Sequence, residues 1–342
     1  MARIDYKQSG VNIDAGNEVV RRIKSLARST YTPNVLSGIG SFGGLFRMDP
    51  SLTEPVLVAS ADGVGTKLKL AFMTGVHDTI GADLVNHCVN DILVQGASPM
   101  FFLDYLATGR LSPDVAEQIV KGVARACGEN GCALLGGETA EMPGFYTDGE
   151  YDVAGFIVGV VERARVIDGS RITAGDVLLG MPSTGLHTNG YSLARKIVFD
   201  ALKVDVSAHV AELGTTVGDA LMRTHRSYLR DVQPLLAAGR FKGMAHITGG
   251  GLTENTPRML PEGTVAVIDR RSWTVPPLFN WLQHGGGIAE AEMLRAFNMG
   301  VGLVIAVAEA DAAAVLRAIP DAWSLGHIAA GERGVEYVGG RG

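Results

Sequence analysis

The apolar positions of this chain follow two patterns. Short apolar runs predict buried strands, and they cover residues 55–61, 100–107, 132–135, 153–161, 177–181, 245–248, 265–269 and 301–308. Segments in which apolar residues return every three or four positions predict helices, and they cover residues 15–27, 78–95, 113–127, 191–200, 252–260, 277–283, 289–297 and 310–318. A last pair of strands follows. Strands that alternate with helices in this way predict an α/β (α+β) fold.

The length of 342 residues predicts two domains at about 150 residues per domain. Between residues 162 and 176 the sequence turns polar and charged, ERARVIDGSRITAGD. We therefore place the domain boundary near residue 170. The N-terminal domain would comprise residues 1–169 and the C-terminal domain residues 170–342.

Composition narrows the class of protein. A hydrophobic content of 46% with 19% charged residues excludes a disordered chain. The net charge of −6 provides no broad basic surface, so no nucleic-acid partner is expected. No apolar stretch reaches the ~20 residues that a bilayer requires, so no membrane partner is expected. The three cysteines form no CxxC pair and are too few for a disulfide framework, which favours the reducing cytoplasm.

Acidic residues from separate segments are the first candidates for chemistry. Asp62 and Glu138 each stand where a predicted strand meets glycines, and Lys67 follows Asp62. The predicted helix 78–95 has a polar face without Lys, Arg or Glu, composed of Asp83, Asn86, His87, Asn90 and Asp91. Such short side chains suit coordination better than solvation. Each carboxylate alone is explained by a turn or a cap, but Asp62, Asp91 and Glu138 together fit one or two Mg²⁺ ions shared with a polyphosphate.

A glycine-rich loop covers residues 38–44, GIGSFGG. It matches the dinucleotide pattern G-x-G-x-x-G, but no predicted strand precedes it and no helix follows it, which argues against a Rossmann site. The sequence also lacks a GxxxxGK[ST] phosphate loop. Two interpretations stay open. The loop is either a flexible surface segment or a lid whose backbone N–H groups close over phosphates.

Two histidines of the second half, His187 and His246, lie beside glycines and hydroxyl residues that precede predicted helices. Helix starts of this kind bind phosphate monoesters. A single loop histidine is more often structural than catalytic, so position alone assigns neither of them a role.

Six sequence blocks together resemble one known family. They are DGVGTKL (62–68), VNDILVQGA (89–97), FFLDYLATG (101–109), GGETAEMPG (136–144), STGLHTNGYSLAR (183–195) and ITGGGLTENTPR (247–258). In this order they resemble the phosphoribosylformylglycinamidine cyclo-ligases, also called aminoimidazole ribonucleotide synthetases. The resemblance runs from about Tyr6 to the last strand.

The resemblance implies an ATP-dependent ring closure of formylglycinamidine ribonucleotide to aminoimidazole ribonucleotide, ADP and phosphate. It also implies a homodimer, in which the N-terminal domains pair into a shared β-barrel flanked by helices, and a C-terminal α/β sandwich. Selenophosphate synthetases of the same superfamily carry an N-terminal cysteine and an Asp before the TGGGL loop. This chain has no cysteine before Cys88 and has His246 at that position. A small-molecule kinase of the superfamily and a non-catalytic nucleotide-binding dimer stay open as alternatives.

The resemblance also implies roles for particular residues. Mg²⁺ would be held by Asp62, Asp91 and Glu138. The ATP site would be formed by Lys24, Gly40, Ser41, Phe42, Gly43, Asp62, Gly63, Thr66, Lys67, Asp91, Gly137, Glu138 and Thr139. The substrate would be bound by Asn189, Gly190, Thr248 and Gly249. His187 or His246 would move the protons released on cyclisation, and the sequence does not choose between them.

Overall fold

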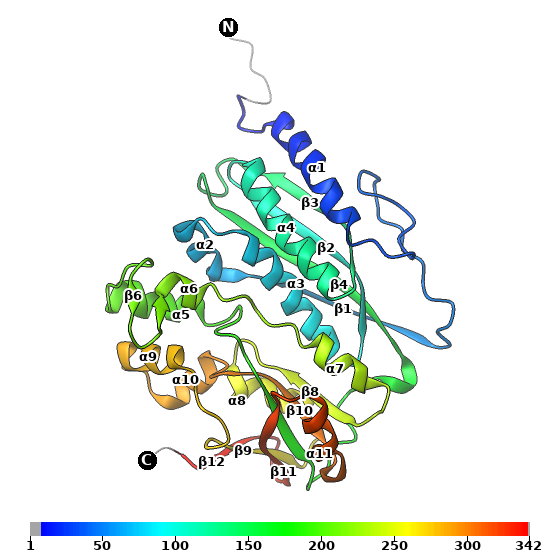
Figure 1. Cartoon of the computed structure of the whole chain (residues 1–342), viewed down its shortest axis with the longest axis vertical. Coiled ribbons are helices and arrows are strands. Elements are labelled where there is room, and N and C mark those ends of the chain that lie inside the picture. Colours follow the sequence, from blue (N-terminus) through cyan, green and yellow to red (C-terminus); the bar gives the residue numbers. More distant parts are fainter. Residues whose placement is uncertain (1–7, 341–342) are drawn as a thin grey trace. The chain divides into compact units, whose positions relative to one another are not determined.

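The computed structural model describes residues 8–340, and these divide into two compact units (Figure 1). Unit 1 contains residues up to Ile92 together with Pro99–Val160, and unit 2 contains Leu93–Ser98 together with the chain from Val161 onward. The division near Val161 lies somewhat before the position 170 expected from composition. Among the described residues no helix is long and apolar enough to cross a membrane.

Unit 1 is built on a four-stranded sheet in the order β1-β4-β2-β3. The strands are β1 (Pro55–Gly63), β2 (Ser98–Thr108), β3 (Ala133–Glu141) and β4 (Tyr151–Glu162). The helices are α1 (Ile13–Arg28), α2 (Leu68–Thr74), α3 (Asp78–Leu93) and α4 (Pro113–Glu129). Helices α3 and α4 lie over one face of the sheet in Figure 1. The sheet of the described chain is open, with β1 and β3 as its edges.

Glycines allow helices α3 and α4 to approach each other closely. A Cβ atom at Gly81 would lie 2.1 Å from the carbonyl oxygen of Ile119, and one at Gly122 would lie 1.9 Å from the carbonyl oxygen of Asp78. No side chain fits at these distances. Two residues that lower helix propensity are therefore required by the packing of the helix pair.

Strand β3 differs from the sequence-based expectation. The apolar run predicted a strand that ends at residue 135 and empties into a glycine loop, but the strand continues to Glu141. It pairs in parallel with β2 from Phe101 opposite Ala133 to Thr108 opposite Glu141. A Cβ atom at position 137 would lie 2.0 Å from Oδ1 of Asp104 on β2, so Gly137 is required inside the strand by close packing rather than by a turn. Strand β1 likewise continues through Asp62 to Gly63.

Unit 2 is built on a six-stranded sheet in the order β12-β9-β11-β5-β10-β8. Its strands are β5 (Val177–Pro182), β8 (Phe241–His246), β9 (Thr264–Asp269), β10 (Val301–Val307), β11 (Trp323–Ala330) and β12 (Gly334–Val338). The pairings are antiparallel except that of β12 with β9. All seven residues of β10 are buried, which explains its continuous apolar sequence.

Short helices surround the sheet of unit 2. They are α5 (Tyr191–Arg195), α6 (Val217–Leu221), α7 (Leu229–Leu236), α8 (Gly251–Asn255), α9 (Pro277–Gly286), α10 (Glu290–Ala296) and α11 (Glu309–Ala318), and a two-stranded hairpin is formed by β6 (His209–Val210) and β7 (Thr215–Thr216). Two predicted helices are less regular than expected. The segment 191–200 changes from α5 to a π-helix at Lys196. The segment 252–260 becomes a 3₁₀ turn at Thr256, because Pro257 has no N–H to continue the α-helix.

Candidate functional site

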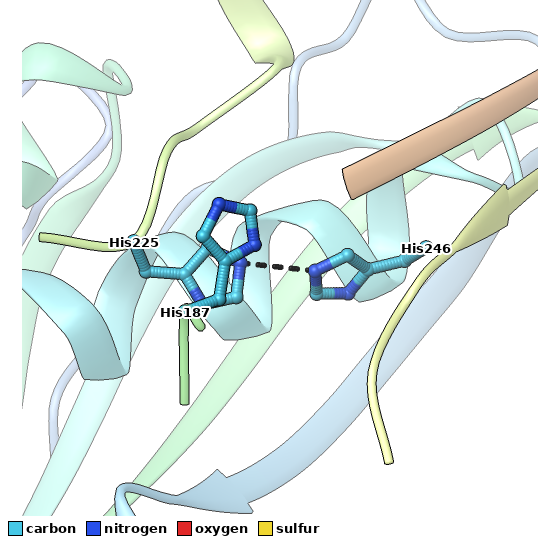
Figure 2. A group of neighbouring side chains, drawn as sticks. All are labelled: His187, His225 and His246. Carbon is cyan, nitrogen blue, oxygen red and sulfur yellow. Dashed lines mark hydrogen bonds between the residues drawn. The ribbon is translucent and has the colours of Figure 1, made fainter. Parts of the chain in front are cut away.

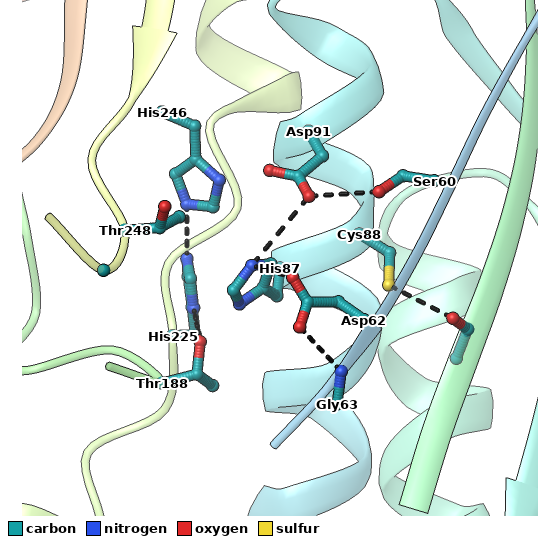
Figure 3. A network of polar contacts seen from close by, with 12 residues as sticks. Ser60, Asp62, Gly63, His87, Cys88, Asp91, Thr188, His225, His246 and Thr248 are labelled. Atoms are coloured by element: carbon teal, nitrogen blue, oxygen red, sulfur yellow. Dashed lines mark hydrogen bonds and ion pairs between the residues drawn. The ribbon is translucent and has the colours of Figure 1, made fainter. Parts of the chain in front are cut away.

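In unit 1 the carboxylates of Asp62 and Asp91 approach the same histidine (Figure 3). Asp62 lies near the end of β1, whereas His87 and Asp91 lie one turn apart on α3. The Nε2 atom of His87 is 2.7 Å from Oδ2 of Asp62 and 3.9 Å from Oδ2 of Asp91. Ser60, also on β1, donates its hydroxyl to Asp91 Oδ2 at 3.1 Å. The fold thus brings together two acidic residues that the sequence placed in separate segments.

The electrostatics of this group favour opposite charges on Asp62 and His87. Burial alone would raise the pKa of Asp62, but the hydrogen bond and charge of His87 and the N–H of Gly63 outweigh it, so the pKa is lowered. Burial alone would lower the pKa of His87, but the hydrogen bond to Asp62 and the charges of Asp91, Asp62 and Asp83 outweigh it, so the pKa is raised. When protonated, the imidazole side chain supplies positive charge between the two carboxylates.

The donor set around His87 fits a hard divalent cation. Asp62 and Asp91 remain partly exposed, with 39% and 28% of their side-chain surfaces accessible. Two carboxylates and the hydroxyl of Ser60 are oxygen ligands of the kind that Mg²⁺ prefers. A cation bound to both carboxylates would take over the charge compensation that His87 provides.

Glu138 lies apart from this pair within one chain. It is an exposed residue of β3, whereas Asp62 belongs to β1, and β4 and β2 lie between these two edge strands. Three strand spacings correspond to about 14 Å, too far for one ion to contact both carboxylates. Glu138 therefore does not join Asp62 and Asp91 around one ion within one chain, because β3 runs on as an edge strand instead of turning into a loop, and its place in the nucleotide site stays a prediction.

Lys67 is also placed differently from the expectation. Its side chain is fully buried, and Nζ lies 2.6 Å from Oδ2 of Asp83, which is also fully buried. Burial lowers the pKa of Lys67, and the charge of Asp83 opposes that effect. The ammonium group thus joins the 3₁₀ turn Gly65–Lys67 to helix α3 inside the unit. In this arrangement it cannot contact a triphosphate. Its neighbour Thr66 is exposed.

The glycine-rich segment 38–44 forms the tip of a small loop that is closed at its base by hydrogen bonds. Its base is fixed by the backbone hydrogen bond from Leu36 N to Leu45 O at 2.8 Å and by the bond from Leu45 N to the hydroxyl of Ser37 at 2.7 Å. At its tip Phe42 is fully exposed. Lys24, on α1, is exposed as well. An anchored base with an exposed aromatic tip suits a lid, although a surface loop would have the same geometry.

In unit 2 three buried histidines from three segments meet (Figure 2). His187 follows β5, His225 lies between α6 and α7, and His246 ends β8. The rings of His187 and His225 are stacked, with centroids 3.9 Å apart and planes 18° apart. Nε2 of His225 lies 3.0 Å from Nε2 of His246. His225 was not among the residues expected from sequence, because a single histidine in a polar connecting segment has no distinguishing pattern.

The predicted substrate residues also come together in unit 2. Asn189 follows His187, and its Oδ1 would lie 3.2 Å from a Cβ atom at Gly249. The Nδ2 atom of Asn189 is buried and has no hydrogen-bond partner among the described residues. Asn255 donates from Nδ2 to the carbonyl oxygens of Gly249 at 3.0 Å and of Thr248 at 3.4 Å, which fixes that loop. A buried amide with an unused donor beside a fixed glycine loop is suited to binding a polar ligand.

Comparisons with known proteins agree with these two units. The family model of the AIR synthase related protein, N-terminal domain, matches residues 47–161, and that of the C-terminal domain matches residues 173–339. Among solved structures, a thiamine-monophosphate kinase from Stenotrophomonas maltophilia superposes with a TM-score of 0.69 at 19% identity, covering 94% of this chain and 96% of that chain. Hydrogenase maturation protein HypE in complex with ATP superposes with a TM-score of 0.67 at 19% identity, covering 96% and 93%. At such identities the likeness shows the fold alone.

Curated relatives are far more similar in sequence. Phosphoribosylformylglycinamidine cyclo-ligase from Trichlorobacter lovleyi is 54% identical over 331 residues, which cover 95% of each chain. The protein of the same name from Geobacter metallireducens is 54% identical over 340 residues, which cover 98% of each chain. The resemblance seen in the sequence blocks is confirmed, and the chain belongs to the phosphoribosylformylglycinamidine cyclo-ligase family.

Proposed function

We propose that this protein is a ligase that closes the imidazole ring of aminoimidazole ribonucleotide from formylglycinamidine ribonucleotide, with conversion of ATP to ADP and phosphate, in purine biosynthesis. The observation that carries the proposal is identity above 50% to cyclo-ligases along nearly the whole of both chains. Both units match the family models of the AIR synthase related proteins.

The chemistry explains why ATP is needed. A formamide carbonyl is a poor electrophile, and its oxygen is a poor leaving group. We infer that the formyl oxygen attacks the γ-phosphorus of ATP, that the ribose-bound nitrogen then attacks the formyl carbon, and that phosphate leaves while a proton is lost from nitrogen. The ring closure itself is intramolecular, because the ribose-bound nitrogen and the activated formyl carbon belong to the same molecule.

We assign the nucleotide to unit 1. Asp62 and Asp91 would hold Mg²⁺, which when bound would neutralise charge on the transferring phosphate. The exposed residues Thr66 and Lys24 and the loop of Gly40, Ser41, Phe42 and Gly43 would contact the triphosphate from outside the sheet. Gly63, Gly137, Glu138 and Thr139 remain predicted members of the site. Solved structures of the same fold hold ATP or AMPPCP, which supports the choice of ligand.

We assign the substrate to unit 2. Asn189 and Gly249 are adjacent, Asn189 has a buried donor without a partner, and Gly190 and Thr248 flank them in sequence. His187 and His246 lie beside these residues along the chain and would handle the proton that the ring nitrogen loses.

We further propose that the enzyme is a cytoplasmic homodimer. One face of the unit 1 sheet exposes apolar side chains, among them Leu57 on β1 and Phe156 on β4, with 60% and 45% of their surfaces accessible. A second copy that covers this face would bury these side chains and close the open sheet into a barrel. Cys88, Cys127 and Cys132 are all buried free thiols, which suits a reducing compartment.

The proposed function is tested by incubating the purified protein with formylglycinamidine ribonucleotide, ATP and Mg²⁺. Aminoimidazole formation and phosphate release are followed in the same sample. We expect equal amounts of both products. ATP consumption with phosphate retained on an organic product, or no ATP consumption at all, would contradict the assignment.

A further inference from the structure

The two loops proposed for the substrate rest on one connecting segment of unit 2. Residues 297–300 lead from α10 into β10. A Cβ atom at Gly190 would lie 2.6 Å from Cδ1 of the Phe297 ring, and one at Gly251 would lie 2.8 Å from the carbonyl oxygen of Phe297. Phe297 is itself buried. Both loops therefore approach this segment closely, and each does so at a glycine.

Asn298 joins this segment to the loop 183–190. It is buried, with 3% of its surface accessible. Nδ2 donates to the carbonyl oxygen of Gly185 at 2.9 Å. Oδ1 accepts from the hydroxyl of Ser183 and from the backbone N–H of Gly300, both at 2.9 Å. Both ends of the amide are thus used, which a carboxylate could not match because it has no hydrogen to donate.

The backbone around Asn298 is held in a defined turn. Met299 has a φ of 52°, in the left-handed region that residues with a side chain rarely adopt. The bond from the N–H of Gly300 to the side chain of Asn298 closes this turn. Trp273 also donates from Nε1 to the carbonyl oxygen of Met299 at 3.0 Å. The amide of Asn298 is therefore held in place independently of the loop that it contacts.

Packing alone does not fix the start of the loop 183–190. Ser183, Thr184 and Gly185 line a cavity of about 200 Å³ together with the first residues of α9. Space beside a loop permits it to shift, whereas a close-packed interior does not. Thr184 donates its hydroxyl to the carbonyl oxygen of Thr224 at 2.6 Å, and Asn298 bonds to the residues on either side of Thr184. The position of this part of the loop thus depends on hydrogen bonds, of which Asn298 supplies two.

The opposite loop is held by a second buried asparagine. Asn255 donates from Nδ2 to the carbonyl oxygens of Thr248, Gly249 and Gly251. The two loops meet where Oδ1 of Asn189 would lie 3.2 Å from a Cβ atom at Gly249. The buried amide of Asn189 therefore stands beside a loop whose own position is fixed.

We propose that Asn298 is a positioning residue for the substrate, which holds the loop 183–190 in its binding conformation before the substrate arrives and so keeps Asn189 beside Gly249. The inference rests on the proposed function. A loop that is already ordered spends no binding free energy on becoming ordered. Without the bonds of Asn298, only a fraction of the molecules would have the loop in the binding conformation, and the apparent affinity would fall by that fraction.

Two substitutions of Asn298 separate its contacts. Asn298→Ala removes all three hydrogen bonds. Asn298→Asp keeps acceptors for Ser183 and Gly300, so the turn is retained, but it cannot donate to Gly185 and places a charge against that carbonyl oxygen. Asn280→Ala, at a half-buried asparagine of α9, is the matched control. The full-length protein is used throughout, with ATP, Mg²⁺ and formylglycinamidine ribonucleotide.

For both variants of Asn298 we expect KM for formylglycinamidine ribonucleotide to rise about tenfold, because the loop is competent in only a fraction of the molecules. The kcat and the KM for ATP should stay nearly unchanged, since the bound substrate selects the same loop conformation and the nucleotide is assigned to unit 1. Hydrogen exchange of the unliganded protein, followed by mass spectrometry, should become faster in peptides that cover 183–190 and stay unchanged in peptides that cover β9. Asn280→Ala should match the unmodified enzyme in each measurement.

Other results would overturn the proposal. These are an unchanged KM for formylglycinamidine ribonucleotide, an equal rise of both KM values, a loss confined to thermal stability, or unaltered exchange in 183–190. If Asn298→Ala does not fold, Asn298→Asp decides by the same criteria. If the unmodified protein makes no aminoimidazole, the proposed function fails, and the exchange data would still decide whether Asn298 holds the loop.

Discussion

At the scale of single residues, the fold selects among the side chains that the sequence offers. Asp62 and Asp91 are brought to one histidine, whereas Lys67 is buried against Asp83 and Glu138 lies on the opposite edge strand. All four were candidates for the nucleotide site because each is a charged residue near glycines or on a polar helix face. Only the distances between them show which can act together.

The role of Asp91 gives a prediction at this scale. Asp91→Asn keeps the size of the side chain and can still accept from Ser60, but it removes a charge on which the proposed Mg²⁺ binding depends. We expect turnover to fall by about 10²-fold or more, as for other lost groups that stabilise transition-state charge, and higher Mg²⁺ to be needed for half-maximal rate. Steady-state kinetics across a Mg²⁺ series measures both effects.

The matched control is Asp148→Asn, which removes the same charge from an exposed position of unit 1. It should leave the rate and the Mg²⁺ dependence unchanged. Full activity of Asp91→Asn with an unchanged Mg²⁺ requirement would remove Asp91 from the metal site.

At the scale of elements, hydrophobic periodicity located most helices and strands, and packing decided their ends. Helix α1 was expected over 15–27 and spans Ile13–Arg28, where the side chain of Asn12 accepts from Ala15 N. Strand β3 was expected to stop at its glycines, but β2 provides a hydrogen-bonding partner as far as Glu141. Pairing with a neighbour is a tertiary effect, so a local pattern cannot show where a strand stops.

The glycines of α4 give a prediction at this scale. In Gly122→Ala the new methyl group would meet the backbone of α3, and we expect the free energy of unfolding to fall by roughly 1–3 kcal/mol through overpacking. In Gly128→Ala of the same helix, a Cβ atom meets nothing within 4 Å. Helix propensity should then stabilise the protein by about 0.5–1 kcal/mol. Urea unfolding of both variants compares them, and equal effects would contradict the close approach of α3 and α4.

At the scale of the whole molecule, the open face of the unit 1 sheet determines how the chain would assemble. Leu57 alternates with half-buried residues along β1, and Phe156 alternates with buried residues along β4, which is typical of a sheet with two contrasting faces. In the proposed dimer, a second copy of the chain would cover both of these exposed side chains.

The assembly gives the prediction at this scale. Phe156→Asp places a charge on the open face, and we expect a dimer of the unmodified chain to become a monomer, since an unpaired charge is costly to bury. Sedimentation equilibrium measures the mass, and circular dichroism checks that the variant is folded. Val338→Asp is the control, at an exposed apolar residue of unit 2. A folded variant with the mass of the unmodified dimer would place the interface elsewhere.

The sequence by itself determined the fold class, the order of the elements and the family, and it named the residues proposed for the site. The periodicity of apolar residues reflects which faces of helices and strands are buried, and motif blocks preserve the chemistry of a family. Both signals can therefore be recognised in a single sequence. Tertiary structure alone decided that Lys67 is enclosed, that Glu138 stands on the far edge strand and that His225 joins His246. These facts depend on distances between segments far apart in sequence, which strand order and close packing set and no local pattern contains.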